Sequence, residues 1–137
     1  MSDVGLTHIA LAVTDADASI DFYSRYANME VVHERQDEES GRRVVWLSDK
    51  TRPFVIVFLE AESAAPVLEP FAHLGVGCES REEVDRLCSL ARKEGVLVRE
   101  PVDSGYPVGY WAFLRDPDGH SLELAFGQEV GLTVEKA

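Results

Sequence analysis

The chain has 137 residues, a length that suits one domain or two small modules sharing a core. Hydrophobic residues make up 45% of it and charged residues 28%, which excludes a generally disordered chain. Thirteen Lys and Arg against 25 Asp and Glu give a formal charge of −12, so nucleic acid and membrane surfaces are disfavoured as partners. The N-terminal apolar run 9–13 is too short for a membrane helix and no signal-like segment precedes it, which predicts a cytoplasmic protein.

The sequence repeats itself at an offset of about 65 residues. Each copy begins with a short alternating run headed by a histidine, continues with an amphipathic segment, and ends with three further alternating runs. The first copy predicts strands at 8–13, 29–34, 42–48 and 54–59, and a helix at 16–27. The second copy predicts strands at 73–78, 95–100, 110–115 and 121–126, with a helix that begins after Ser80 and ends before Gly95.

This order predicts an α+β fold of two βαβββ modules whose mixed sheets curve around a shared cleft. One domain spans 1–137, with module one at about 5–60, a linker at 61–72, module two at about 73–127, and a tail at 128–137. Neither module buries enough apolar surface alone, so we expect the two to pair. Open sheet edges also favour a homodimer, with the modules paired within one chain or exchanged between two chains.

Three strands show the same distribution of side chains between their two faces. One face of each carries bulky apolar residues, and the other carries one metal-binding group, His8, His73 or Glu123, among small residues. A single histidine on a strand is usually structural, but three such groups at equivalent positions favour a shared site. Two imidazoles and one carboxylate suit Fe, Mn, Ni or Zn and leave positions open for substrate.

The remaining histidines and the cysteines have simpler explanations. His120 follows the turn residues 116–119 and is predicted to close that turn, and His33 is expected on the surface. Cys78 and Cys88 have no disulfide or CxxC pattern, so we expect reduced, partly buried thiols.

Aromatic residues between glycines at 106–111 predict one wall of a pocket for a flat ligand, with Tyr106, Tyr110 and Trp111 lining it. The alternative is that Trp46 and Trp111 are buried strand aromatics at equivalent positions of the repeat.

The chain resembles the vicinal oxygen chelate superfamily, which includes glyoxalase I, methylmalonyl-CoA epimerase, extradiol dioxygenases and the fosfomycin- and bleomycin-resistance proteins. The resemblance covers about residues 5–127 and rests on the stretches 7–13, 19–23 and 115–124. It implies paired βαβββ modules that form a curved, partly open barrel around a metal. It also implies that His8, His73 and Glu123 stand at ligand positions.

Some residues depart from the patterns of the known branches. Shifting Glu123 back by the repeat offset reaches Val57, where glyoxalase I and the epimerase carry Glu or Gln. Valine can neither bind a metal nor act as a general base. Glu60 has the opposite parity and is expected to cap the strand end, with a bulge as its only route to the metal. Phe113 stands where extradiol dioxygenases and fosfomycin enzymes have an active-site tyrosine, so it is a candidate substrate contact.

Two functions are compatible with these residues. The first is a divalent-metal-dependent enzyme, of lyase, isomerase or dioxygenase type, acting on a small substrate chelated through adjacent oxygens. The second is a metal-free protein that binds or sequesters a small molecule, as bleomycin-resistance proteins do. The cost of burying Glu123 without a partner favours the enzyme.

Overall fold

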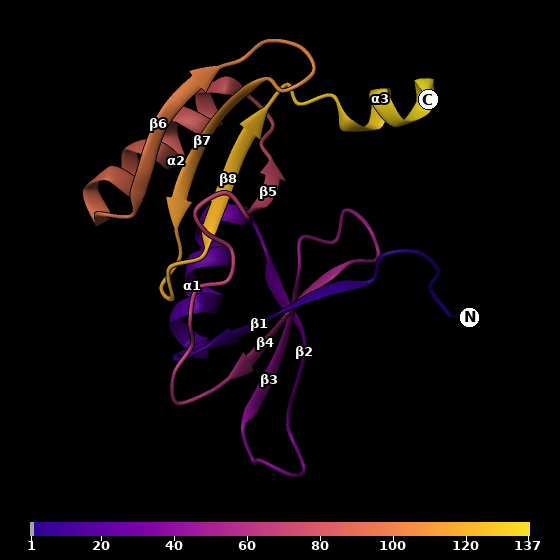
Figure 1. Ribbon diagram of the computed structural model, residues 1–137, viewed down its shortest axis with the longest axis vertical. Coiled ribbons are helices and arrows are strands. Elements are labelled where there is room, and N and C mark those ends of the chain that lie inside the picture. The colour runs from indigo at the N-terminus through magenta and orange to yellow at the C-terminus, as the bar shows by residue number, and fades with distance from the viewer. Residues whose placement is uncertain (1) are drawn as a thin grey trace. The chain divides into compact units, whose positions relative to one another are not determined.

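The computed structural model describes residues 2–137, which divide into two compact units between Pro66 and Val67, inside the expected linker. The first unit contains β1 (His8–Val13), α1 (Ala16–Ala27), β2 (Glu30–Gln36), β3 (Arg43–Ser48) and β4 (Val55–Glu60) (Figure 1). The second contains β5 (Leu74–Gly77), α2 (Arg81–Glu94), β6 (Leu97–Asp103), β7 (Tyr110–Arg115), β8 (Ser121–Phe126) and α3 (Val130–Lys136). The predicted α+β class and the repeated βαβββ order are confirmed, and the segment assigned as a tail contains the short helix α3.

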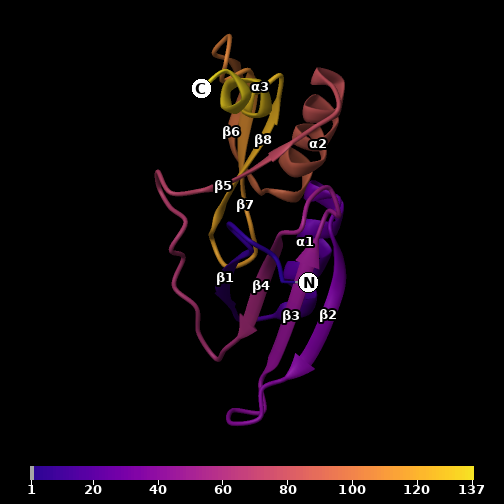
Figure 2. The same ribbon diagram turned by 90° about the vertical axis from the view of Figure 1, so that its right-hand side faces the viewer.

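Each unit has one four-stranded mixed sheet, and the two sheets have the same topology. The strand orders are β1-β4-β3-β2 and β5-β8-β7-β6. In each sheet the first and last strands of the unit pair in parallel, and the other neighbours are antiparallel. The last strand of each unit, β4 or β8, therefore lies inside its sheet rather than at an edge, as Figures 1 and 2 show.

Local capping interactions set the limits of both long helices. The Asp15 carboxylate accepts a hydrogen bond from the Ala18 amide at the start of α1, and Ser80 does the same for Glu83 at the start of α2. At their ends, Asn28 and Gly95 adopt the left-handed conformation that stops a helix. None of the helices in the described part of the chain is long and apolar enough to cross a membrane.

The core of each unit lies between its long helix and one face of its sheet. In the first unit, the Tyr23 ring of α1 stacks against Phe58 of β4 at 5.4 Å between ring centroids. In the second, α2 buries Val84, Leu87, Cys88 and Ala91 over the sheet residues Ala112, Leu114, Leu122 and Leu124. The bulky residues of the alternating strands therefore face the helices, as predicted, and the histidine-bearing positions face the other way.

The turn that joins β7 to β8 is built around Asp116. Its carboxylate accepts the amides of Asp118 and His120, and its amide donates to the His120 carbonyl, so His120 closes the turn as predicted. The His120 ring is fully buried, and its Nδ1 accepts the amides of Val67 and Leu68 at 3.3 Å each. His120 thus anchors the end of the linker to the second unit.

Both cysteines are free thiols, as expected, and both belong to the α2 side of the second sheet. Burial raises the pKa of the Cys78 and Cys88 thiols to about 11, with the nearby carboxylates of Glu83 and Glu100 adding to the effect. At neutral pH both side chains are therefore protonated and weakly nucleophilic.

We predict that neither thiol reacts readily with a dithiobis-nitrobenzoate reagent at pH 8. A thiol of pKa about 11 is ionised to only about 0.1% there, so the folded protein should react about 100-fold more slowly than the unfolded chain. The rate should rise steeply between pH 8 and pH 10. A Cys88→Ser variant isolates the contribution of Cys78, and fast reaction of either thiol at pH 8 would contradict the prediction.

Candidate metal centre

Glu123 carries a buried carboxylate on the face of the second sheet that turns away from α2. It is the third residue of β8, between two leucines that face the helix, and it is only 8% exposed. Among residues 2–137, no side chain or amide donates a hydrogen bond to its carboxylate oxygens. A carboxylate that is largely covered by the protein and receives no hydrogen bond from it is a candidate for binding a cation or a ligand.

His73 lies next to this carboxylate, with one ring nitrogen directed toward it. Its Nδ1 is 2.7 Å from the Phe71 carbonyl oxygen, which can only accept, so Nδ1 carries the proton. The other nitrogen, Nε2, keeps its lone pair in the neutral ring and lies 3.9 Å from Glu123 Oε2. At this separation the two atoms do not form a hydrogen bond. Two ligand atoms that each lie about 2.0–2.2 Å from one ion can be up to about 4 Å apart, so the separation is compatible with a shared ion.

Gly75 provides the space that the Glu123 carboxylate occupies. The two residues are direct partners in the parallel pairing of β5 with β8. A Cβ atom at position 75 would lie 3.2 Å from Glu123 Oε2, closer than an ordinary van der Waals contact, whereas a Cβ at Gly77 would meet nothing within 4 Å. The small residue beside the carboxylate is therefore a specific steric requirement.

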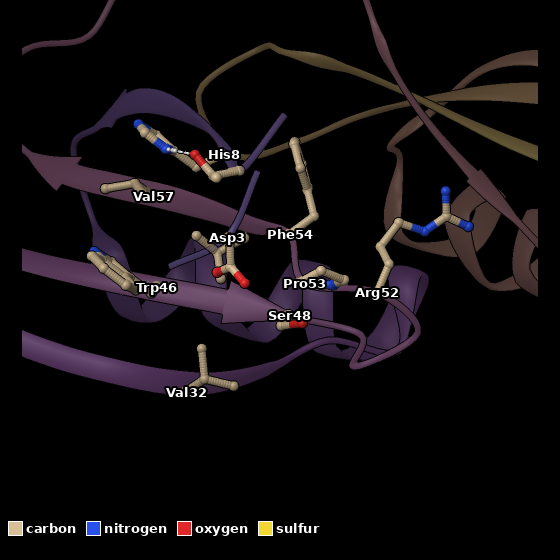
Figure 3. A pocket seen from close by; sticks show the side chains of 11 residues that line it. Asp3, His8, Val32, Trp46, Ser48, Arg52, Pro53, Phe54 and Val57 are labelled. Carbon is tan, nitrogen blue, oxygen red and sulfur yellow. Dashed lines mark hydrogen bonds between the residues drawn. The ribbon is translucent and has the colours of Figure 1, made fainter. Parts of the chain in front are cut away.

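His8, the third predicted ligand, begins β1 of the first unit. Its Nδ1 is 2.9 Å from Thr7 Oγ1, which leaves Nε2 available (Figure 3). The ring borders a cavity of about 350 Å³ together with Val57 and Trp46, and Phe54 lines its other end. Within the described residues of either unit, three His, Cys, Asp or Glu side chains do not gather at one point. The convergence of His8 with His73 and Glu123 stays a prediction.

Val57 occupies the position in the first unit that Glu123 occupies in the second. Val57 pairs with Ala10, two residues after His8, and Glu123 pairs with Gly75, two residues after His73. The repeat offset used on the sequence therefore aligned the two strands correctly. The first unit supplies an imidazole but no carboxylate at this level of the sheet.

The fold agrees with what comparisons with known proteins show. Residues 5–124 match the model of the glyoxalase/bleomycin resistance protein/dioxygenase superfamily. The chain belongs to this superfamily. It is 37% identical to an uncharacterised protein of Pseudomonas aeruginosa, over 92% of this chain and 91% of that one. It is 26% identical to a probable lactoylglutathione lyase of Vibrio cholerae, over 90% and 91%.

A solved structure shows the same glyoxalase-type fold. The trypanothione-dependent glyoxalase I of Leishmania major aligns over 98% of this chain and 94% of its own, with a TM-score of 0.73 and 25% identity. The resemblance seen in the sequence is thereby confirmed at the level of the glyoxalase superfamily.

Two of the four predicted substrate contacts lie on the same sheet face as Glu123. Phe113 of β7 is the direct pairing partner of Glu123, and its ring meets His73 edge-to-face at 4.9 Å between centroids. Trp111 meets Phe113 at 5.3 Å, and its indole N–H donates to Ser104 Oγ at 2.8 Å. These rings form an aromatic floor beside the candidate ligands.

The other two predicted contacts do not belong to this floor. Tyr110 has the opposite parity on β7, and its hydroxyl donates to Asp85 of α2 at 2.5 Å, which raises the pKa of Tyr110. Tyr110 therefore lies on the α2 side of the sheet, opposite to Phe113 and Trp111, and its contact with a substrate stays a prediction. Tyr106 lies in the β6–β7 loop, is 64% exposed, and its ring is 5.9 Å from Lys136 Nζ of α3.

The register also corrects the suggested equivalence of the two tryptophans. Trp46 pairs with Val57, and Phe113 pairs with Glu123, so Phe113 rather than Trp111 is the counterpart of Trp46. Trp46 is 36% exposed and contacts the ring of the exposed His33, which is a surface residue as predicted.

Arg99 also lies on this face of the sheet, although the sequence pattern did not identify it as a site residue. It pairs with Phe113, and its guanidinium lies 4.8 Å from the centre of the Trp111 ring. Two register shifts interrupt the pairing of β6 with β7, so simple alternation along β6 cannot show which side chains face the floor.

The Glu60 carboxylate binds the N-terminus of the first helix, α1. Its Oε2 accepts the Ala16 amide at 3.1 Å, at the N-terminus of α1, and the pairing of β1 with β4 continues through Glu60 without a bulge. The carboxylate satisfies a buried amide and interacts favourably with the helix dipole.

We predict that Glu60→Ala lowers the free energy of unfolding by about 1–3 kcal/mol, because the buried Ala16 amide loses its acceptor. Urea unfolding measures the change. Glu62→Ala is the control, because the exposed ion pair between Glu62 and Arg42 should change stability by less than about 1 kcal/mol. Loss of bound metal from Glu60→Ala at unchanged stability would place Glu60 in the metal centre instead.

Proposed function

We propose that this protein is a divalent-metal-dependent enzyme of the glyoxalase superfamily in which His8, His73 and Glu123 hold one ion. The main support is the Glu123 carboxylate, which is buried without a hydrogen-bond donor and lies 3.9 Å from the lone-pair nitrogen of His73. Neutral imidazole and carboxylate are ligands for Fe, Mn, Ni and Zn. When bound, such an ion acts as a Lewis acid on a substrate chelated through two adjacent oxygens.

The surrounding residues have defined tasks in this proposal. The Phe71 carbonyl holds the His73 ring in the tautomer and orientation that a ligand needs, as hydrogen-bonded partners of metal-bound histidines do. Gly75 leaves room for the carboxylate, and Phe113 covers the sheet beside both groups. The substrate therefore meets an apolar floor next to the ion and few competing polar groups.

A lyase-type reaction is favoured because the Vibrio cholerae relative is named a probable lactoylglutathione lyase and aligns along nearly its whole length. Val57 favours a second candidate, a binding protein that sequesters a small molecule. With valine in the place of a carboxylate, the first unit offers no general base at that position and presents an apolar cavity of about 350 Å³. Metal content separates the two candidates.

Elemental analysis of protein purified without chelator should find about one divalent transition metal per chain. His8→Ala, His73→Ala and Glu123→Gln should each weaken the metal affinity by more than about 100-fold, since even outer partners of metal ligands contribute about 10–100-fold. His33→Ala is the control, because His33 is exposed on β2. Wild-type protein that binds no metal after loading would exclude the enzyme and favour the binding protein. Variants with full metal content would exclude His8, His73 and Glu123 as the ligands.

Gly75→Ala should weaken metal binding by about 10–100-fold without unfolding the protein, because the new Cβ displaces Glu123 Oε2. Gly77→Ala is a matched control on the same strand and face, and it should leave the affinity within about threefold. Titration with a metal-responsive dye measures both variants, and circular dichroism checks the fold. Equal affinities of the two variants would contradict the assigned role of Glu123.

A further inference from the structure

An unbroken series of ring contacts leads from the candidate metal centre to a guanidinium. His73 meets Phe113 at 4.9 Å, Phe113 meets Trp111 at 5.3 Å, and the Arg99 guanidinium lies over Trp111 at 4.8 Å. All four side chains are on the face of the second sheet that carries Glu123. The indole of Trp111 is held by its hydrogen bond to Ser104, so the ring beneath Arg99 has a defined orientation.

Arg99 has no acidic partner within residues 2–137, although the chain has almost twice as many acidic as basic side chains. Its sequence neighbour Glu100 binds Arg92 instead. Most of the other described arginines form ion pairs with carboxylates: Arg25, Arg42, Arg43, Arg81, Arg86 and Arg92. A guanidinium that rests on an indole and keeps its donors unused is suited to an incoming anion.

The sheet register sets the distance between the two ends of this face. Gly75, Glu123, Phe113 and Arg99 lie in one row across four adjacent strands. Neighbouring strands are about 4.8 Å apart, so the backbone of Arg99 lies about 10 Å from the backbone of Glu123. Phe113 lies between them. A ligand that reaches both ends must be elongated, with an apolar, flat middle part.

We propose that Arg99 binds an anionic group of the substrate. The substrate class is a planar molecule that presents two adjacent oxygens at the His73 and Glu123 end and a carboxylate or phosphate at the Arg99 end. Its middle part packs against the rings of Phe113 and Trp111, which meet edge-to-face. This inference rests on the proposed function for the chelating end, whereas the anion subsite depends only on residues of the second unit.

Isothermal titration calorimetry of Zn(II)-loaded protein with caffeate and with its methyl ester tests the subsite. The two probes share a catechol and a planar chain, and only caffeate has a terminal carboxylate. Zinc is chosen because it does not oxidise the catechol. Wild-type protein should bind caffeate about 10–100-fold more tightly than the ester, the range of a charge-assisted hydrogen bond.

Arg99→Leu should reduce this preference to about twofold or less, and Arg99→Lys should restore part of it. Arg115→Leu is the matched control, because Arg115 is exposed, lies on the same face of β7, and has no acidic partner in the described part of the chain. Equal affinity of wild-type protein for the two probes, a preference that is lost with Arg115 and not Arg99, or no binding of caffeate at millimolar concentration would overturn the proposal.

Repeating the titration without metal separates the two proposals. If the metal is absent from the site but Arg99 binds anions, zinc will change neither affinity and the Arg99-dependent preference will persist. If the metal centre is correct and the Arg99 subsite is not, zinc will tighten both probes equally and the preference for caffeate will be missing.

Discussion

The parallel pairing of the first and last strands in each unit decides which side chains share a sheet face. In the second unit this pairing sets Gly75 beside Glu123 and brings His73 to the same face. A slip by one residue would turn Glu123 toward α2, into a layer of buried leucines. An unpaired carboxylate there would be very costly, so the cost of burying Glu123 favours the observed register of β8.

The two units use one backbone plan for different chemistry. At the same level of the sheet, the second unit has Glu123 and Phe113 where the first has Val57 and Trp46. The first unit consequently presents an apolar cavity with an imidazole at its edge, and the second presents a carboxylate, an imidazole and aromatic rings. The repeated fold therefore carries two sheet faces whose side chains are not interchangeable.

The acidic character of the chain limits where positive charge is available. A formal charge of −12 attracts cations to the surface and repels anions of the solvent. Most described arginines are neutralised locally by carboxylates, so positive charge is available at few positions. A guanidinium held on Trp111 can select an anion only because its own neighbours do not already satisfy it.

Much of this architecture was evident in the sequence because its signals are local. Alternation with a period of two identified the faces of β1, β5 and β8, and the caps Ser80 and Gly95 set the limits of α2. The repeat offset then aligned Val57 with Glu123, which the strand pairing confirmed. The helix α3 was not predicted, because no side chain caps its start.

Tertiary structure decided the features that depend on partners distant in the chain. Tyr110 and Trp111 looked like one pocket wall, but adjacent strand residues face opposite ways and Asp85 of α2 takes the tyrosine hydroxyl. Glu60 accepts a hydrogen bond from the amide of Ala16, which lies 44 positions away in the sequence. Arg99 faces the aromatic floor because β6 shifts register, which no periodic pattern records. A sequence determines which face of a regular strand a side chain occupies, whereas only packing between elements determines what that side chain meets.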